Sequence, residues 1–197
     1  MNRIRRIVLT GGPGAGKTVV ATRLAAGCPD RFAVVPEAAT LVYQRLRKRW
    51  SQLDVAGRRD VQRQIYRLQL EQDEAASASA PGLTLLLDRG TVDGAAYWPD
   101  GPEDYWRELG TALNAECARY DAVIWLQTSA AIGAYDGGAS NSARDEAAPV
   151  AIALGQQLRE LWSHHAHFYC VDAYPTIERK IATVEQIIQN IIDSGLR

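Results

Sequence analysis

Gly11-Gly12-Pro13-Gly14-Ala15-Gly16-Lys17-Thr18 is the stretch of sequence that decides the fold. It matches the pattern G-x-x-x-x-G-K-[ST] at every fixed position. The β-branched run at 4–10 before it is typical of a buried strand, and a helix is expected over 17–26. A strand, a glycine-rich loop and a helix in this order predict a P-loop, which binds the phosphates of a nucleoside triphosphate.

The residue types in the loop fit this chemistry. Glycines let main-chain N–H groups wrap around phosphates without obstruction from a Cβ atom, and the N-terminus of the following helix adds partial positive charge. Lys17 is expected to reach the β- and γ-phosphates, and Thr18 is expected to hold Mg²⁺ through its hydroxyl. The residues predicted to bind the nucleotide are Gly12, Pro13, Gly14, Ala15, Gly16, Lys17, Thr18 and Val19.

The rest of the chain alternates short apolar runs with helical patterns. Buried strands are predicted over 32–35, 83–87, 122–126 and 167–171. Helices are predicted over 38–50, 60–76, 105–120, 149–162 and 176–192. Repeated strand-then-helix units predict an α/β, three-layer P-loop NTPase fold, in which a parallel sheet of about five strands is flanked by helices.

Length, composition and charge narrow the class of protein. The 197 residues suit one kinase-like domain over 1–197, in which the segment 128–149, rich in small and polar residues, is expected to form a lid. The formal net charge of −1 gives no reason to expect a nucleic acid partner. Three scattered cysteines and an N-terminal apolar run too short for a signal peptide or membrane span predict a cytoplasmic protein. The oligomeric state stays open.

Two acidic residues follow predicted strands directly. Glu37 comes after the strand at 32–35, and Asp88 comes after the strand at 83–87. Ligands of parallel sheets bind beyond the carboxyl ends of the strands, where a carboxylate can hold Mg²⁺ or take a proton from a hydroxyl or water. Asp88 is therefore predicted to hold Mg²⁺ with Thr18, and both acids are catalytic candidates. The alternatives are a solvated strand-end aspartate and a glutamate favoured by a helix dipole.

Arginines supply the candidate anion contacts. Arg89 directly follows Asp88 and can bind a phosphate or another substrate anion through two hydrogen bonds, unless it is a surface residue paired with Asp88. Arg144, in the predicted lid, can close over the phosphates and stabilise the transferring charge, unless it is an ordinary loop residue. Arg45 begins a basic stretch that ends at Arg67 and either receives a second substrate or forms a solvated face.

The chain resembles a group of AAA-like P-loop ATP-binding proteins related to the kinase domain of bacterial nicotinamide-riboside kinase and regulator proteins. A eukaryotic GTP- and phosphoinositide-binding trafficking protein belongs to the same group. The matching pieces lie at 10–18, 35–39, 87–90 and 141–146, with the terminal helix around Lys180. More distantly, the chain is similar to nucleoside and nucleotide kinases.

The resemblance implies roles for the strand-end residues. It makes Glu37 the candidate base for a substrate hydroxyl, Asp88 a magnesium or substrate acid, and Arg89 and Arg144 phosphate clamps. The resulting hypothesis is a phosphotransferase that moves the γ-phosphate of ATP, with Mg²⁺, to a small nucleoside-like or other acceptor. The alternative is a nucleotide-dependent regulatory module that hydrolyses ATP or GTP slowly; the absence of an N/T-K-x-D motif favours ATP over GTP.

Overall fold

The computed structural model describes residues 5–46, 50–135 and 147–194. Its strands form one parallel sheet in the order β2-β3-β1-β4-β5. The strands are β1 (Arg5–Thr10), β2 (Phe32–Val35), β3 (Thr84–Asp88), β4 (Ala122–Leu126) and β5 (Phe168–Val171). This arrangement confirms the predicted parallel sheet of about five strands.

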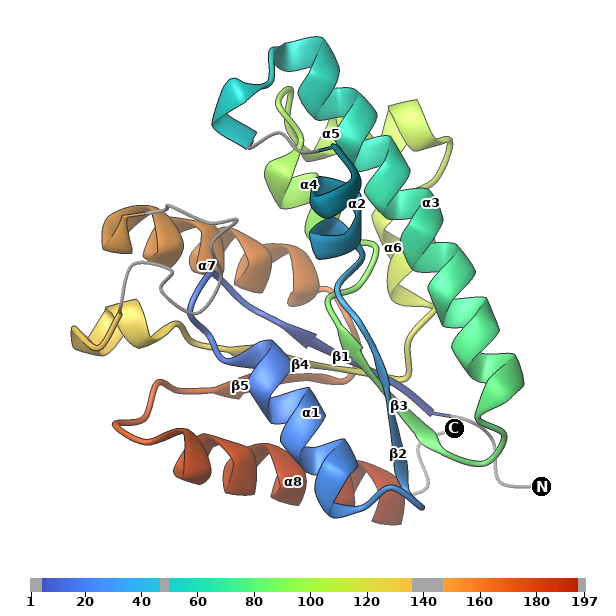
Figure 1. Cartoon of the computed structure of the whole chain (residues 1–197), viewed down its shortest axis with the longest axis vertical. Helices are drawn as coiled ribbons and strands as arrows, with labels where there is room; N and C mark the ends of the chain where they lie inside the picture. The colour runs from blue at the N-terminus through green and yellow to red at the C-terminus, as the bar shows by residue number, and fades with distance from the viewer. Residues whose placement is uncertain (1–4, 47–49, 136–146, 195–197) are drawn as a thin grey trace.

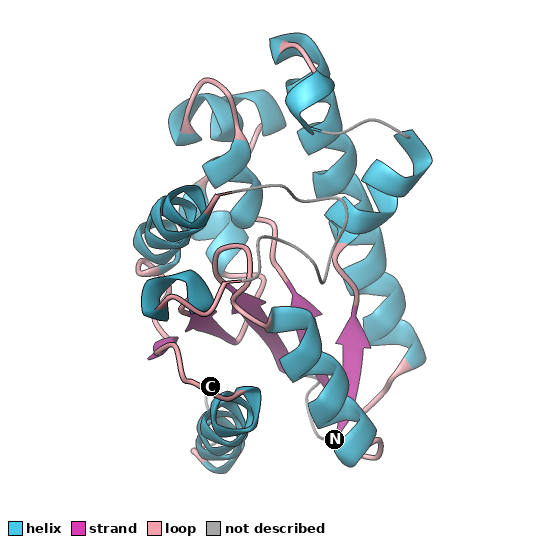
Figure 2. Ribbon diagram, turned by 60° about the vertical axis from the view of Figure 1, so that its left-hand side comes forward, coloured by secondary structure: helices cyan, strands magenta, loops and turns pink. Residues whose placement is uncertain are grey.

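Helices cover both faces of the sheet (Figures 1 and 2). Two of them, α1 and α8, pack on one face, whereas α3, α6 and α7 lie toward the other. The helices are α1 (Lys17–Gly27), α2 (Ala38–Leu46), α3 (Val55–Ser79), α4 (Asp93–Tyr97), α5 (Pro102–Leu109), α6 (Leu113–Cys117), α7 (Ala148–Trp162) and α8 (Ile177–Asp193), with 3-10 turns η1 (Trp50–Gln52) and η2 (Ser129–Ile132). The three-layer α/β fold is therefore confirmed.

The core divides between the two faces because successive side chains of a strand point to opposite sides. In β1, Ile7 and Leu9 face α1 and α8, whereas Val8 faces Trp162 of α7. All three β1 side chains are fully buried. Continuous apolar strands such as β3 and β4 are what a sheet covered on both faces requires.

Two predicted helices end earlier than expected. The helix predicted over 105–120 is divided into α5 and α6, because Gly110 takes a left-handed conformation (φ 67°) that ends α5. The helix predicted over 38–50 is α2 up to Leu46, and Trp50 lies in η1. The short helix α4 was not predicted, because five residues are too few for a periodic pattern.

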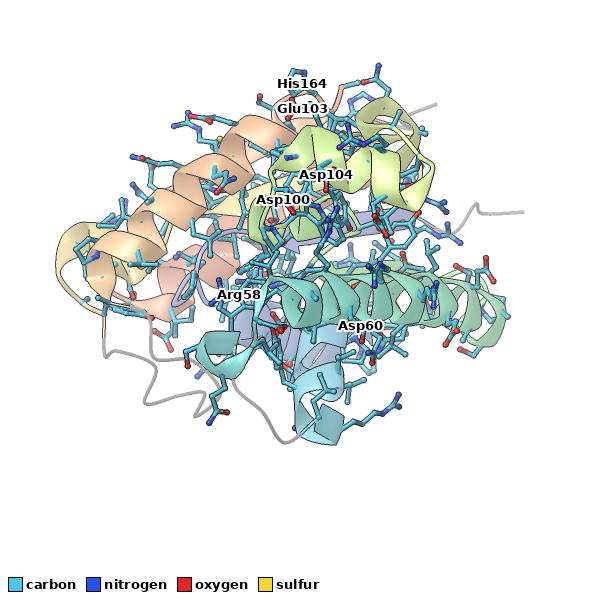
Figure 3. The ribbon with its side chains drawn as sticks, turned by 90° about the horizontal axis from the view of Figure 1, so that it is seen from above. Arg58, Asp60, Asp100, Glu103, Asp104 and His164 are labelled. Carbon is cyan, nitrogen blue, oxygen red and sulfur yellow. The ribbon has the colours of Figure 1, made fainter. Side chains whose placement is uncertain are left out.

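Two arginines of the basic stretch form ion pairs within the fold. Arg59 of α3 pairs with Asp104 of α5, and Arg63 pairs with Glu108 at 2.9 Å. Figure 3 shows the start of α3 beside the segment that carries Asp100 and Asp104. These contacts join α3 to α5, so this part of the stretch is not the simple solvated face or docking surface that the sequence left open.

Some predictions fall wholly or partly outside the described residues. Arg144 and half of the predicted lid lie in 136–146, and the basic residues at 47–49 are also outside. Within the predicted lid, the structure describes η2 and the beginning of α7. Among the helices of the described residues, none is long and apolar enough to cross a membrane.

Candidate functional site

The P-loop joins the end of β1 to the start of α1. Its conformation depends on glycine, because Gly11, Gly14 and Gly16 all have positive φ angles, of 136°, 71° and 83°. Gly12 is needed for a different reason: a Cβ atom there would lie 2.4 Å from the main-chain oxygen of Ala151. The loop is therefore packed against α7 and shaped for main-chain N–H groups to face an anion.

Lys17 lies at the N-terminus of α1 and is 5% exposed. Its Nζ donates hydrogen bonds to the main-chain oxygens of Gly11, at 2.9 Å, and Gly12, at 3.2 Å. These bonds hold the ammonium group over the loop in which the phosphates are expected. Its contact with the β- and γ-phosphates stays a prediction.

Thr18 and Asp88 meet beside the loop, although they are 70 residues apart in the chain. The Thr18 hydroxyl donates to Asp88 Oδ2 at 2.5 Å. Asp88 is 1% exposed, and its Oδ1 has no hydrogen-bond partner among the described residues. Burial raises the pKa of Asp88, whereas the charge of Lys17 acts in the opposite direction.

This pair fits a magnesium ion held partly by phosphates. Mg²⁺ prefers oxygen ligands and is commonly bound by one or two protein groups together with substrate phosphates and water. The Thr18 hydroxyl and the unpaired Asp88 oxygen are such groups, and a bound cation would offset the desolvation of the carboxylate. The described residues contain no group of three or more His, Cys, Asp or Glu side chains that would hold a metal without such help.

Arg89 turns away from the loop and links two acids. Its Nε donates to Glu37 Oε1 at 2.6 Å, and its Nη1 donates to Asp93 Oδ2 at 2.7 Å. Burial alone would lower the pKa of Arg89, but the neighbouring Tyr97, Glu37 and Asp93 groups raise it well above the usual value. Arg89 is thus a buried cation in an acidic cluster, rather than a surface residue paired with Asp88.

The backbone at Arg89 contributes to this arrangement. Arg89 is the non-glycine residue with a positive φ, at 83°, in the part of the chain that the structure describes. Such a backbone conformation is uncommon for residues other than Gly, Asn or Asp, and it persists where surrounding contacts stabilise it. The turn lets consecutive residues serve different neighbours: Asp88 contacts Thr18, and Arg89 contacts Glu37.

Asp93 is a site residue that the sequence reasoning missed. It is 3% exposed and accepts hydrogen bonds from the Thr10 hydroxyl at 2.9 Å and from Trp162 Nε1 at 2.6 Å, as well as from Arg89. It therefore ties the acidic cluster to β1 and α7. Its position four residues after Arg89 could have indicated an ion pair between the two residues. That spacing brings two side chains together only where the chain turns as in a helix, and helix α4, which begins at Asp93, was not predicted.

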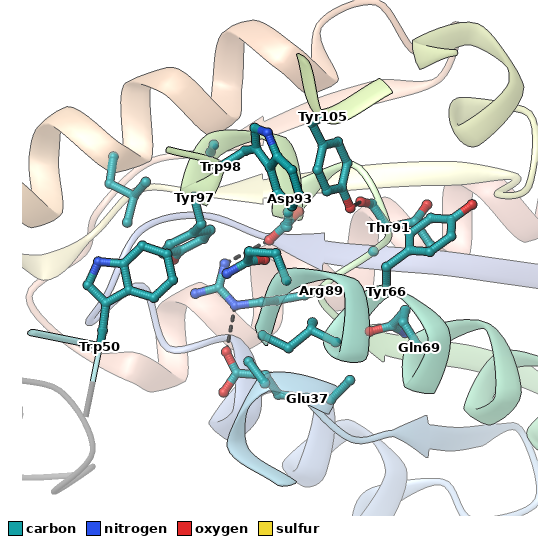
Figure 4. Close-up of a pocket in the computed structure, with 18 of the residues that line it drawn as sticks. Glu37, Trp50, Tyr66, Gln69, Arg89, Thr91, Asp93, Tyr97, Trp98 and Tyr105 are labelled. Carbon is teal, nitrogen blue, oxygen red and sulfur yellow. Dashed lines mark hydrogen bonds and ion pairs between the residues drawn. The ribbon is translucent and has the colours of Figure 1, made fainter. Parts of the chain in front are cut away.

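A cavity of about 460 Å³ adjoins the acidic cluster (Figure 4). Glu37, Arg89 and Asp93 line one part of it, and residues of α2, η1, α3, α4, α5 and α7 form the walls. Asp88 and Thr18 are not among the lining residues. The site thus has two compartments, the P-loop with Thr18 and Asp88 and the cavity with Glu37, and the consecutive residues Asp88 and Arg89 connect them.

Not every predicted site residue joins these compartments. Arg45 is exposed on α2 and does not line the cavity. Val19 is 43% exposed on α1. Arg144 lies outside the described residues, so its predicted role as a lid arginine stays a prediction.

Lys180 of α8 binds the P-loop and the loop that follows β4. It is 4% exposed, and its Nζ donates to the main-chain oxygens of Ala15, at 3.0 Å, and Gln127, at 2.8 Å. Gln127 in turn accepts from the main-chain N–H of Ala173 after β5. Burial lowers the pKa of Lys180 to about 8. Lys180 therefore joins the loops after β1 and β4, and the side chain of Gln127 adds the loop after β5.

The fold and the site define a P-loop protein of the nucleotide-binding class. A sequence model of the family described as the AAA domain matches residues 6–180. The match covers all five strands, apart from the first residue of β1, and it ends within the first turn of α8. The chain belongs to this AAA domain family. No curated protein matches the chain.

Proposed function

We propose that this protein is a phosphotransferase that moves the γ-phosphate of ATP, bound with Mg²⁺, to a hydroxyl group of a small acceptor molecule. One observation carries the proposal. The cavity of about 460 Å³ lies beside the P-loop compartment and is lined by a buried acid, Glu37, where an acceptor hydroxyl would meet the γ-phosphate. A nucleotide switch that only hydrolyses ATP needs no second substrate cavity.

The division of labour follows the two compartments. The P-loop and Lys17 hold the phosphates, and Thr18 and Asp88 hold Mg²⁺, which screens the negative charge of the phosphates when it is bound. Glu37 accepts hydrogen bonds from Arg89 and from Thr40 Oγ1, at 2.7 Å. Glu37 lines the cavity, so its carboxylate is placed to accept the proton of an acceptor hydroxyl. Catalysis then depends mainly on positioning and charge.

The test is Glu37→Gln, assayed with γ-labelled ATP and a panel of nucleosides and related alcohols. The glutamine keeps an oxygen that can accept from Arg89 Nε but cannot act as a base. We expect transfer to fall by about 10²-fold or more, with ATP affinity nearly unchanged. The matched control is Thr40→Val, which removes a neutral hydrogen bond to Glu37 and keeps its charge. Transfer at the wild-type rate in Glu37→Gln would show that Glu37 is not the base.

The competing function is a nucleotide-dependent module with slow ATP or GTP hydrolysis. Its outcome in the same assay is slow release of labelled phosphate with no labelled acceptor. In such a module, the basic stretch would be the surface that meets an anionic partner. Arg59 and Arg63 are instead paired with acids of α5, which leaves the cavity as the stronger observation.

A further inference from the structure

Lys180 is a buried cation that the proposed reaction does not use. It lies in the first turn of α8, which packs beside α1 on the same face of the sheet (Figure 1), and it is 4% exposed. Among the described residues, its Nζ donates to two neutral carbonyl groups, those of Ala15 in the P-loop and Gln127 after β4. Carbonyl oxygens satisfy the N–H groups of an ammonium ion, but they do not neutralise its charge.

The charged side chains of α8 and α1 near Lys180 are engaged with one another at the surface. Glu178 is exposed on α8 and pairs with Arg23 of α1 at 2.9 Å. Arg179, also exposed on α8, stacks on the ring of Tyr174. None of these contacts places a carboxylate against the buried ammonium group.

The loops around Lys180 add no anion within the described chain. The P-loop carries one charged side chain, that of Lys17, and it is positive. The segment 127–135 after β4 contains no Asp or Glu, and Asp172 after β5 is exposed. The N-termini of α1 and α8 add partial positive charge on the same side. Lys180 is therefore a cation in surroundings that disfavour positive charge.

The charge of Lys180 is sensitive to pH for this reason. Burial lowers the pKa of its ammonium group to about 8, and no neighbouring acid acts in the opposite direction. Deprotonation removes one of three N–H groups, so the neutral amine still has enough donors for both carbonyl groups. The hydrogen bonds to the two loops thus survive a change of pH that removes the charge.

A bound nucleotide would supply the missing anion. Phosphates in a P-loop contact its main-chain N–H groups, and Ala15, whose carbonyl oxygen accepts from Lys180, belongs to that loop. One layer of main chain then separates the ammonium group from the phosphates, and water screens charges weakly at a buried position. The phosphates favour the protonated form of Lys180, and by linkage the protonated form binds the phosphates more tightly.

We propose that Lys180 is a positioning residue for the nucleotide that acts by its charge through the main chain of the P-loop, and that the protein takes up a proton at Lys180 when Mg·ADP or Mg·ATP binds. The hydrogen bonds hold the loops in both protonation states, whereas nucleotide affinity follows the charge. The inference rests on nucleotide binding by the P-loop and does not depend on transfer of the γ-phosphate.

Calorimetric titration of the full chain with Mg·ADP at pH 8, in Tris and in HEPES, measures the protons exchanged, because the two buffers differ in ionisation enthalpy. Lys180 is about half protonated in the free protein at this pH, so we expect uptake of up to about 0.5 proton per nucleotide. Between pH 7 and pH 9 the dissociation constant should rise by about tenfold. A lysine that acts by hydrogen bonding alone exchanges no proton and gives equal affinity at both pH values.

Three variants assign the proton. Lys180→Arg keeps its charge throughout this pH range, so we expect no uptake at pH 8 and equal affinity at pH 7 and pH 9. Lys180→Met has no charge, so we expect no uptake and affinity at least about tenfold weaker than wild type at pH 7. The matched control is Arg179→Met, which removes an exposed positive charge from the adjacent position of α8 and should keep the uptake of wild type.

Proton uptake by wild type that Lys180→Met and Lys180→Arg both lose supports the inference. The absence of uptake in wild type overturns it, as does a failure to bind Mg·ADP. Equal uptake in wild type and Lys180→Met also overturns it, because the proton then belongs to another group, such as Lys17. If Lys180→Met binds too weakly to titrate, the same comparison with Lys180→Arg decides. A protein that takes up the proton as expected but transfers no phosphate contradicts only the proposed function.

Discussion

Replacing Arg89 with alanine and, separately, with glycine tests both the acidic cluster and the backbone beneath it. Both substitutions remove the hydrogen bonds to Glu37 and Asp93, at 2.6 and 2.7 Å. A hydrogen bond to a charged group contributes about 1.5–3 kcal/mol, and removing one partner of a buried ion pair costs about 3–5 kcal/mol. We therefore expect Arg89→Ala to lower the free energy of unfolding by about 4 kcal/mol.

The two variants should differ in a direction that reverses the usual order. Glycine outside a turn is normally less stable than alanine, because it loses more backbone entropy on folding. At φ 83° alanine is strained by about 1–2 kcal/mol and glycine is not, so Arg89→Gly should be the more stable variant by about 1 kcal/mol. Any measured difference belongs to the backbone, since both lack the same ion pairs.

Urea denaturation at pH 7, followed by circular dichroism, measures both quantities. Typical domains have a free energy of unfolding of about 5–15 kcal/mol. A loss of about 4 kcal/mol therefore leaves a measurable folded population in most cases. A loss below about 1 kcal/mol in Arg89→Ala would show that the buried pairs add no more than a surface salt bridge. A glycine variant less stable than the alanine variant would refute the left-handed conformation at this position.

Three further predictions concern the loop and the buried charges. Gly12→Ala should cost about 1–3 kcal/mol and weaken ATP binding, because the new methyl group meets rigid main chain of α7; Gly27→Ala, with open space around it, is the control. Lys180→Met should weaken ATP binding in titration calorimetry, because it frees two carbonyl groups that hold the loops; wild-type affinity would contradict this role. Burial raises the pKa of Asp73 from 3.8 to about 6, so its contribution to stability is greatest at low pH and is lost as pH rises. Between pH 4 and 7, urea titrations should show wild type losing about 2 kcal/mol relative to Asp73→Asn; a constant difference would exclude this linkage.

The sequence predicted those parts of the structure that local pattern controls. The P-loop between β1 and α1 is recognisable because its glycines must take conformations that other residues avoid. The strands are recognisable because a parallel sheet covered on both faces needs continuous apolar runs, as in β3. Glu37 and Asp88 were found because strand ends in such sheets lie beside the ligand.

The face of α3 shows where local pattern was insufficient. Helical spacing of apolar residues places Val61, Ile65 and Leu68 on one side of this helix. Val61 is buried, but the other deeply buried residues are the polar Gln62, Gln69 and Asp73. Polar residues on a buried face contradict amphipathic patterning. They are compatible with the fold because Gln69 donates a hydrogen bond to Asp73, and because both glutamines line the cavity.

By itself, the sequence therefore determined the five strands and their alternation with helices, the P-loop and the positions of two acids, since each depends on neighbouring residues in the chain. Only the tertiary structure decided that Arg89 pairs with Glu37 and Asp93 rather than with Asp88, and that the two glutamines of α3 face an aromatic cavity. These contacts join residues from separate elements, and the packing of the helices α2, α3, α4 and α7 around the sheet edge brings them together. Spacing along the chain carries no record of that packing.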